Sequence, residues 1–262
     1  MLLKWIVCII AGLGAGIGTG LAGLSAAAVI SPMLITFLGF DAYSAVGIAL
    51  ASDVLASAIS ARTYAKNKNL DIKNGLVMLC SVLVFTLAGS YIASLVPNTT
   101  MGSFSVVMTL LLGIKFILRP VMTTRERMAQ KSTRTKIIQS VLCGALIGFI
   151  CGFIGAGGGM MMLLILTSVL GYELKTAVGT SVFIMTFTAL TGAISHFSIS
   201  GALPDLTALV LCVFFTLLGA LLSAKFANKA PAATLNRVTG IVLTVLGAAM
   251  LAVKLLFPSS AG

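Results

Sequence analysis

The sequence contains a duplication in which residues of the first half recur 132 positions later. Ala45-Val46-Gly47 recurs as Ala177-Val178-Gly179, and Leu38-Gly39-Phe40-Asp41 recurs as Leu170-Gly171-Tyr172-Glu173. Four glycines recur at the same shift: Gly12, Gly16, Gly20 and Gly23 match Gly144, Gly148, Gly152 and Gly155. Such halves in an apolar chain are typical of membrane transporters whose site lies where the halves meet.

The composition predicts a membrane protein. Of the 262 residues, 59% are hydrophobic and 9% are charged, and the mean hydropathy is +1.14. A soluble domain carries about a quarter charged residues. The apolar runs are long and continuous, whereas barrel strands would alternate over about ten residues. The predicted fold class is therefore an all-α polytopic membrane protein.

Eight apolar runs are candidate membrane segments: 5–39, 42–62, 74–96, 101–118, 137–171, 175–197, 205–227 and 235–257. The runs 5–39 and 137–171 each hold 35 residues. As helices they would be about 52 Å long, more than one crossing of about 30 Å needs. Glycines interrupt them at 18–23 and 155–159, so we expect each run to consist of two pieces. The piece at 160–170 would be a half-span of about 16 Å.

Lysine and arginine favour a topology in which each long run turns back and leaves the membrane on the side that it entered. The loops 62–73, 119–136 and 225–237 then share one face, which holds 15 of the 17 basic residues, whereas eight plain crossings split them 13 to 4. The positive-inside rule predicts that these loops are cytoplasmic. Two inverted repeats, 1–118 and 137–262, would then be joined by the basic linker 119–136, which forms either a short amphipathic helix or a solvated loop.

The glycine-rich breaks are the first candidate substrate site. Irregular backbone inside a bilayer is tolerated only against protein or a water-filled cavity. The N–H groups that begin a half-helix favour an anion, and glycine lets the anion approach. The candidate residues are Gly155, Gly157, Gly158, Gly159 and Met160, with Gly23 and Ser25 in the first half. For the glycines upstream of each break we favour the alternative, close packing of helices.

Asp53 is the only acidic residue deep in a predicted membrane segment, and Ser52 lies beside it. An intramembrane carboxylate is a functional hypothesis by default. Asp53 could accept a coupling proton, or it could be structural and accept hydrogen bonds from serines or backbone. Met185 stands at the matching position of the second half, so either role would be asymmetric.

Three other polar residues could contact a ligand. Thr180 and Ser181 could donate hydrogen bonds to an oxyanion, or they could bond neighbouring helices. Cys151 could contact a sulfur-containing ligand or pack as a small core residue. One histidine, His196, and one deep carboxylate cannot supply a metal cluster or a catalytic triad. We therefore expect no metal and no enzymatic activity, and we expect no cofactor. The net charge of +11 is explained by the positive-inside bias of a membrane protein, so no nucleic-acid partner is expected.

The stretch GFICGFIGAGGG at 148–159, followed by AVGTS at 177–181, resembles the TauE/SafE sulfite exporter family of bacterial membrane proteins. The first half departs from this pattern, with LSAA at 24–27 and Ile48-Ala49 where the second half has Thr180-Ser181. The resemblance implies movement of small anions, often sulfur-containing ones such as sulfite or organosulfonates, across the bacterial inner membrane.

Together these features predict a secondary transporter of a small anion (sulfite, thiosulfate, an organosulfonate or a small organic acid) that works by alternating access and could be proton-coupled. The expected partners are that anion and the lipid bilayer, and the chain could form a homo-oligomer. Two alternatives stay open: a non-transporting membrane accessory subunit, and a passive anion channel.

Overall fold

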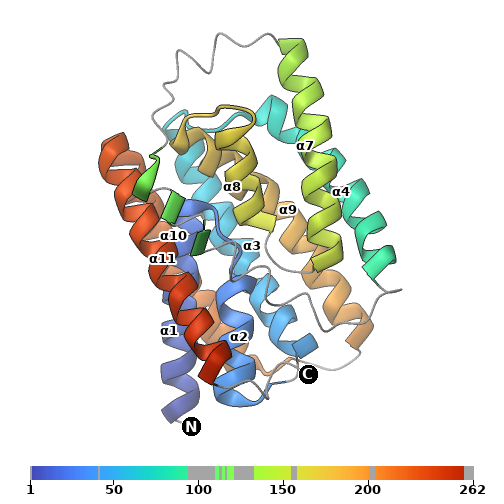
Figure 1. The fold of residues 1–262 in the computed structure, drawn as a ribbon. Helices are drawn as coiled ribbons and strands as arrows, with labels where there is room; N and C mark the ends of the chain where they lie inside the picture. The colour runs from blue at the N-terminus through green and yellow to red at the C-terminus, as the bar shows by residue number, and fades with distance from the viewer. Residues whose placement is uncertain are drawn as a thin grey trace.

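The computed structural model describes residues 2–40, 42–93, 110–111, 114–115, 117–120, 133–154, 158–200 and 204–256. Within these ranges all regular structure is helical, as predicted (Figure 1). The named helices are α1 (Leu2–Ala22), α2 (Ala27–Leu38), α3 (Ala42–Lys66), α4 (Ile72–Ala93), α7 (Thr133–Ile154), α8 (Gly158–Ser168), α9 (Leu174–Ser200), α10 (Leu206–Lys229) and α11 (Ala232–Leu256). Most of the apolar run 101–118 and of the linker 119–136 lies outside the described residues.

Among the described helices, five are long and apolar enough to cross a membrane: Leu2–Ala22, Ser44–Lys66, Leu174–Ile194, Leu206–Lys229 and Ala232–Ala249. The surface of the bundle carries large apolar side chains such as Leu87 and Val210, which are 72% and 62% exposed. The interior, by contrast, is rich in alanine and also buries serine and threonine. This distribution suits a multi-pass membrane protein, whose outer surface faces lipid tails.

Both long apolar runs are broken, as the sequence predicts. The first break begins at Gly23, whose φ of +62° ends α1, and α2 starts at Ala27. The expected break at 18–23 therefore starts later than predicted, because α1 continues through Gly18 and Gly20 to Ala22. In the second run α7 ends at Ile154 and α8 begins at Gly158. The short helix α8 has 11 residues and is about 16 Å long.

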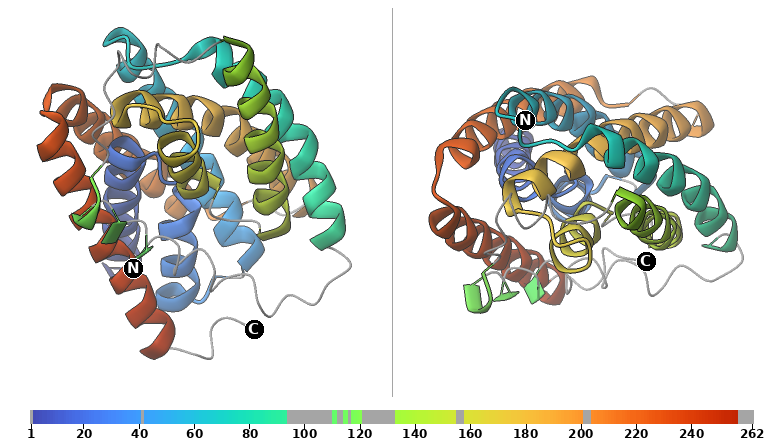
Figure 2. Two further views of the ribbon diagram at one scale, coloured as in Figure 1. Left: turned by 45° about the horizontal axis from the view of Figure 1, so that its top comes forward. Right: turned by 90° about the horizontal axis from the view of Figure 1, so that it is seen from above.

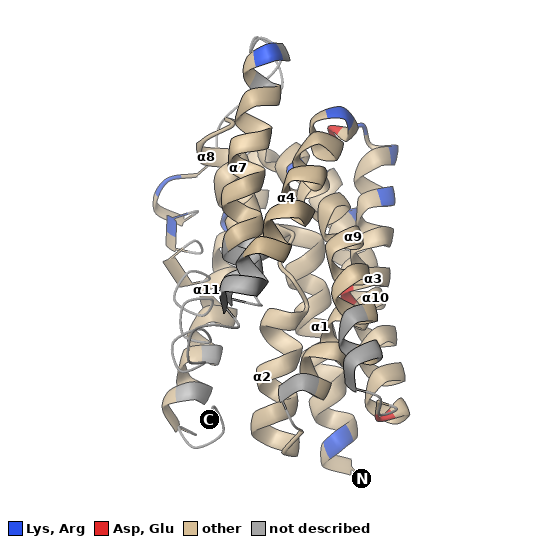
Figure 3. Cartoon of the chain, turned by 90° about the vertical axis from the view of Figure 1, so that its right-hand side faces the viewer, with Lys and Arg blue, Asp and Glu red and all other residues tan. Residues whose placement is uncertain are grey.

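Each broken run turns back on itself. Figures 1 and 3 show α2 returning to the end of the bundle at which α1 starts. The returning helices α2 and α8 are followed by Gly39 and Gly171, which are matched in the duplication and have φ values of +66° and +68°. In both views of Figure 2, α8 lies between α11 on one side and the pair α4 and α7 on the other.

The upstream glycines pack helices of the two halves together. A Cβ placed on Gly16 of α1 would lie 2.2 Å from the carbonyl oxygen of Thr216 in α10. A Cβ on the matching Gly148 of α7 would lie 2.4 Å from the carbonyl oxygen of Val82 in α4. Only glycine permits so close an approach of two backbones. The close-packing interpretation of these glycines is confirmed, and it explains why α1 stays helical through them.

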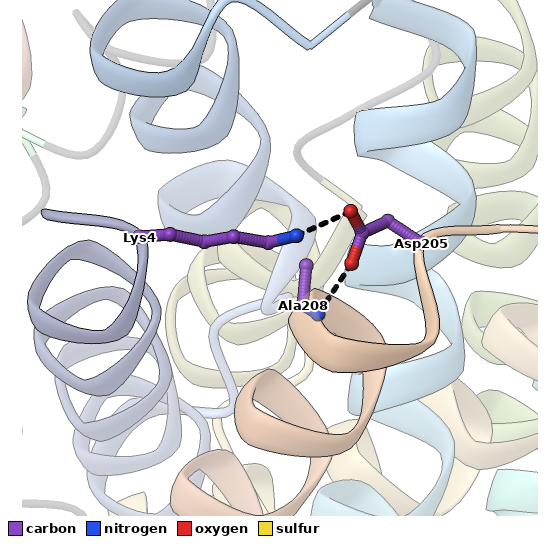
Figure 4. A network of polar contacts seen from close by, with 3 residues as sticks. All are labelled: Lys4, Asp205 and Ala208. Carbon is purple, nitrogen blue, oxygen red and sulfur yellow. Dashed lines mark hydrogen bonds and ion pairs between the residues drawn. The ribbon is translucent and has the colours of Figure 1, made fainter. Parts of the chain in front are cut away.

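The helices α1 and α10 run in the same direction. Lys4 near the start of α1 pairs with Asp205, the N-cap of α10 (Figure 4). Near the end of α1, a Cβ on Gly20 would lie 2.8 Å from the amide nitrogen of Ala224, late in α10. Lysine and arginine lie mainly at the opposite end of the bundle from the N-terminus (Figure 3). The cytoplasmic location of that end and the inverted relation of the halves stay predictions.

Candidate functional site

The start of α8 meets the first break at Gly159, in the first turn of this helix. A Cβ placed there would lie 2.3 Å from the carbonyl oxygen of Gly23 and 2.9 Å from the amide nitrogen of Ser25. Met185 of α9 also borders this position, with its sulfur 2.7 Å from the same Cβ. A side chain at 159 would push the breaks apart, so glycine is required by packing. The first break and the start of α8, which are 136 residues apart in sequence, thus form a single centre where the two halves meet.

Ser181 of α9 completes one wall of this centre. Its hydroxyl oxygen lies 3.4 Å from the carbonyl oxygen of Gly23 and 3.7 Å from the sulfur of Met185. A Cβ on Gly23 would lie 2.9 Å from the same hydroxyl oxygen. Ser181 is fully buried, so this polar group lies against the first break inside the bundle.

Thr180 does not join Ser181 at the breaks. Its hydroxyl oxygen accepts a hydrogen bond from the backbone N–H of Asp71 at 3.2 Å, in the connection before α4. Its methyl group lies 3.3 Å from a Cβ placed on Gly75. Consecutive residues of a helix point about 100° apart, so one of the pair faces the breaks and the other faces α4. The structure therefore separates the two hydroxyl groups that the sequence predicts to act together.

Asp53 lies beside the first break and is 1% exposed. Its carboxylate accepts hydrogen bonds from the hydroxyls of Ser25 at 2.8 Å and Ser57 at 2.9 Å. It also accepts one from the backbone N–H of Ala26, just before α2. The positive end of a helix dipole favours a negative group at this position. The first half therefore places its own carboxylate at the start of its half-helix.

Ser52 takes no part in this network. Its hydroxyl donates to the carbonyl oxygen of Ile48 in its own helix at 2.8 Å. Ser57, one helical turn beyond Asp53, is a hydrogen-bond partner of Asp53 that is absent from the predicted site residues. The i, i+4 spacing of Asp53 and Ser57 could have revealed it, because residues four apart are neighbours on a helix.

Tyr64 of α3 forms a hydrogen bond to the backbone near the end of α1. It is fully buried, and its hydroxyl donates to the carbonyl oxygen of Gly20 at 2.8 Å. Thr19 assists by donating to the carbonyl oxygen of Leu24 at 2.7 Å. These bonds satisfy backbone oxygens that the break leaves without helical partners. The sequence gives no signal for Tyr64, because the contact joins residues 44 apart.

Some predicted site residues cannot be placed in the centre. Gly155 and Gly157 lie outside the described residues. Cys151 lies in α7, and Gly158 and Met160 lie in the first turn of α8, but the structure does not describe the side chains of Cys151 and Met160. Within the described ranges, no group of three or more His, Cys, Asp or Glu side chains could hold a metal ion.

A separate apolar cleft of about 530 Å³ opens between α3 and α9. Its walls include Val54 and Leu55 of α3 and Leu190 and Phe197 of α9. Neither Asp53 nor Ser181 lines it, so the cleft and the polar centre at the breaks are distinct features.

Comparisons with known proteins agree with a transporter. A sequence model of the family described as Sulfite exporter TauE/SafE matches residues 8–250. Two relatives come from Bacillus subtilis (strain 168): "Probable membrane transporter protein YunE" is 27% identical over 94% of this chain and 96% of its own, and "Probable membrane transporter protein YdhB" is 23% identical over 90% and 96%. The Methanocaldococcus jannaschii "Probable membrane transporter protein MJ0441" is 29% identical over 72% and 70%. No solved structure matches the chain.

Proposed function

Because the chain belongs to the sulfite exporter TauE/SafE family, we propose that it is a secondary transporter of a small anion in a bacterial inner membrane. The substrate class is a sulfur-containing anion, namely sulfite, thiosulfate or an organosulfonate, with small organic acids as the second class. The chain acts as a transporter and not as an enzyme.

One contact carries this proposal: Gly159, at the start of α8, packs against the first break at Gly23 and Ser25. The N–H groups of the first turn of α8 have no partners within their own helix, and together with the helix dipole they attract an anion. Ser181 supplies a hydroxyl donor beside them. At the start of α2 the same position is filled by the carboxylate of Asp53. At the start of α8 the residue that matches Asp53 is Met185, whose thioether carries no charge. The positive end of α8 is therefore left for the substrate.

Alternating access follows from the position of this centre between the halves. The parallel packing of α1 on α10 supports an inverted relation of the repeats, because in parallel repeats those helices would run in opposite directions. Rocking one half against the other around fixed breaks would expose the anion to each side of the membrane in turn.

Asp53 is the proposed coupling residue. A carboxylate so close to a bound anion repels it, so the anion binds better when Asp53 is protonated. By linkage, anion binding favours protonation to the same extent. A proton and an anion would then cross together, and a pH gradient would drive accumulation.

Flux into vesicles tests the proposal. The purified full chain is reconstituted in lipid vesicles, and uptake of radiolabelled sulfite, thiosulfate, methanesulfonate and acetate is measured with and without an imposed pH gradient. Accumulation of at least one anion above the level of protein-free vesicles, increased by the gradient, is expected. Flux that ignores the gradient would indicate a passive channel, and no flux of any probe would favour an accessory subunit.

A further inference from the structure

Four polar side chains share one face of α3. Asp53, Ser57, Ser60 and Tyr64 follow one another at spacings of four, three and four residues, which places them in a line along the helix. Each is at most 1% exposed. The line extends about 16 Å from Asp53 to Tyr64, about half the thickness of a bilayer core.

The two ends of this line lie in different surroundings. At one end Ser57 donates to Asp53 at 2.9 Å, beside the breaks. At the other end Tyr64 lies two residues before Lys66, the exposed last residue of α3, and four before the exposed Lys68. A long side chain in a helix points back toward the N-terminus, so the Tyr64 hydroxyl lies on the Ser60 side of its own Cα. The line therefore connects the solvated basic end of the bundle with the buried carboxylate.

Ser60 is distinguished by its hydroxyl. It is fully buried, and within the described ranges it makes no hydrogen bond to protein. The hydroxyl of Ser52 on the same helix is instead committed to the carbonyl oxygen of Ile48. A buried hydroxyl without a partner is costly, and a bridging water with two or more polar neighbours would satisfy it. Such a hydroxyl can accept one hydrogen bond while it donates another.

We infer that this face of α3 is a proton path from the basic end of the bundle to Asp53, with Ser60 as its relay residue. A proton enters beside Tyr64 through water and bonds to the Ser60 oxygen, and Ser60 releases its own proton through a bridging water to the Ser57 oxygen. Ser57 repeats the exchange and passes its proton to the Asp53 carboxylate. Each hydroxyl ends unchanged, and the net reaction is protonation of one carboxylate. The inference rests on the proton coupling in the proposed function.

The described side chains of the helices packed around α3 include few titratable groups. Helix α2 contains none. In the described part of the chain, no charged side chain forms an ion pair or hydrogen bond with Asp53. The ionisable residues of the described side chains on the other helices packed around α3 are Lys4 and Cys8 of α1, Lys175 of α9, and Cys212, Lys225 and Lys229 of α10, with Asp205 at its N-cap.

Infrared spectroscopy after a rapid pH drop tests the path without any substrate. In the purified full chain, the carbonyl band of protonated Asp53 is identified by its loss in Asp53→Asn, and its rate of appearance is measured. Ser60→Ala is expected to slow this rate about tenfold or more, while the final amplitude is unchanged. Ser60→Thr keeps the hydroxyl and is expected to restore the rate.

Ser52→Ala is the matched control, because it removes a buried hydroxyl of the same helix whose hydrogen bond is made within the helix. It is expected to keep the wild-type rate. A wild-type rate in Ser60→Ala, equal slowing in Ser52→Ala, or no Asp53 band at any pH would overturn the path. The first two results could accompany pH-driven anion flux in vesicles, so failure of the path is distinguishable from failure of the proposed function. The third result would refute the proton coupling by Asp53 as well.

Discussion

Gly159 lies directly against the carbonyl oxygen of Gly23, and this contact joins the broken helix of each half at one point. Gly159 of the second half and Gly23 of the first therefore share an environment that neither half could build alone. Irregular backbone is tolerated at membrane depth only where protein or a water-filled cavity surrounds it. The proposed function assigns the anion to this meeting point.

Substitution of Gly159 tests the meeting of the breaks. In Gly159→Ala the new methyl group would clash with the Gly23 carbonyl oxygen and separate the breaks. We expect anion uptake by vesicles to fall about tenfold or more, which corresponds to ~1.4 kcal/mol. Gly14→Ala is the matched control, because its Cβ would lie 3.8 Å from its nearest neighbours. Equal uptake by the two variants would contradict the importance of the contact.

Removing the ionisable group at position 53 tests whether anion transport is coupled to proton transport. In wild-type protein, anion uptake should increase as the pH on the entry side falls, because protonated Asp53 admits the anion. Asp53→Asn cannot titrate, so its uptake should no longer respond to pH. The control Asp205→Asn changes a carboxylate at the N-cap of α10, and its uptake should keep the wild-type response to pH. The coupling role is refuted if uptake by Asp53→Asn retains the wild-type dependence on pH.

We predict that one methyl group added at Gly16 of α1 weakens the packing of this helix on α10. The Cβ of Gly16→Ala would lie 2.2 Å from the Thr216 carbonyl oxygen and 2.8 Å from the Ala220 nitrogen. Because both atoms belong to backbone, the helices must move apart, at a cost of about 1–3 kcal/mol. Thermal unfolding in detergent should show a lower midpoint than in Gly14→Ala. An unchanged midpoint would mean that the helices can move apart to admit the methyl group without loss of stability.

The Asp205 carboxylate both caps α10 and pairs with Lys4 (Figure 4). Its Oδ1 accepts the N–H of Ala208 at 2.9 Å. Asp205→Ala should lose about 1 kcal/mol from the cap and roughly 0–1 kcal/mol from the partly exposed ion pair. Asp205→Asn, which keeps a capping oxygen, should lose mainly the second contribution. Unfolding midpoints of the two variants measure the difference.

The Lys4 ammonium, assisted by the Ala208 N–H, holds the pKa of Asp205 below its usual range. The stabilisation is therefore complete above the ordinary aspartate pKa and disappears as the pH falls through the lowered value. The difference in unfolding midpoint between wild type and Asp205→Asn should shrink over this acidic window. A difference that stays constant with pH would show that the ion pair contributes nothing.

The sequence is sufficient to predict the helical membrane fold and the two breaks, because repeated glycines and overlong apolar runs are local signals. The exact start of the first break is not a local property. Gly16 and Gly20 remain helical because the backbone of α10, some 200 residues later in the chain, packs against them.

Prediction of the candidate site is limited in the same way. Asp53 stands out by itself as a deep carboxylate, and its bond to Ser57 follows helical spacing. Its bond to Ser25 depends on how α2 folds back toward α3. Thr180 and Ser181 are adjacent in sequence, and only the neighbours of α9 decide which of them faces the breaks.

Anomalous scattering from a bound selenite ion tests whether an anion binds where the start of α8 meets the first break. Selenite has the charge and shape of sulfite, and its selenium can be located in crystals of the full chain. We predict selenium beside the first turn of α8, next to Gly159 and within hydrogen-bond reach of the Ser181 hydroxyl. Selenite bound away from both breaks, in protein that still transports it, would show that the anion site lies elsewhere.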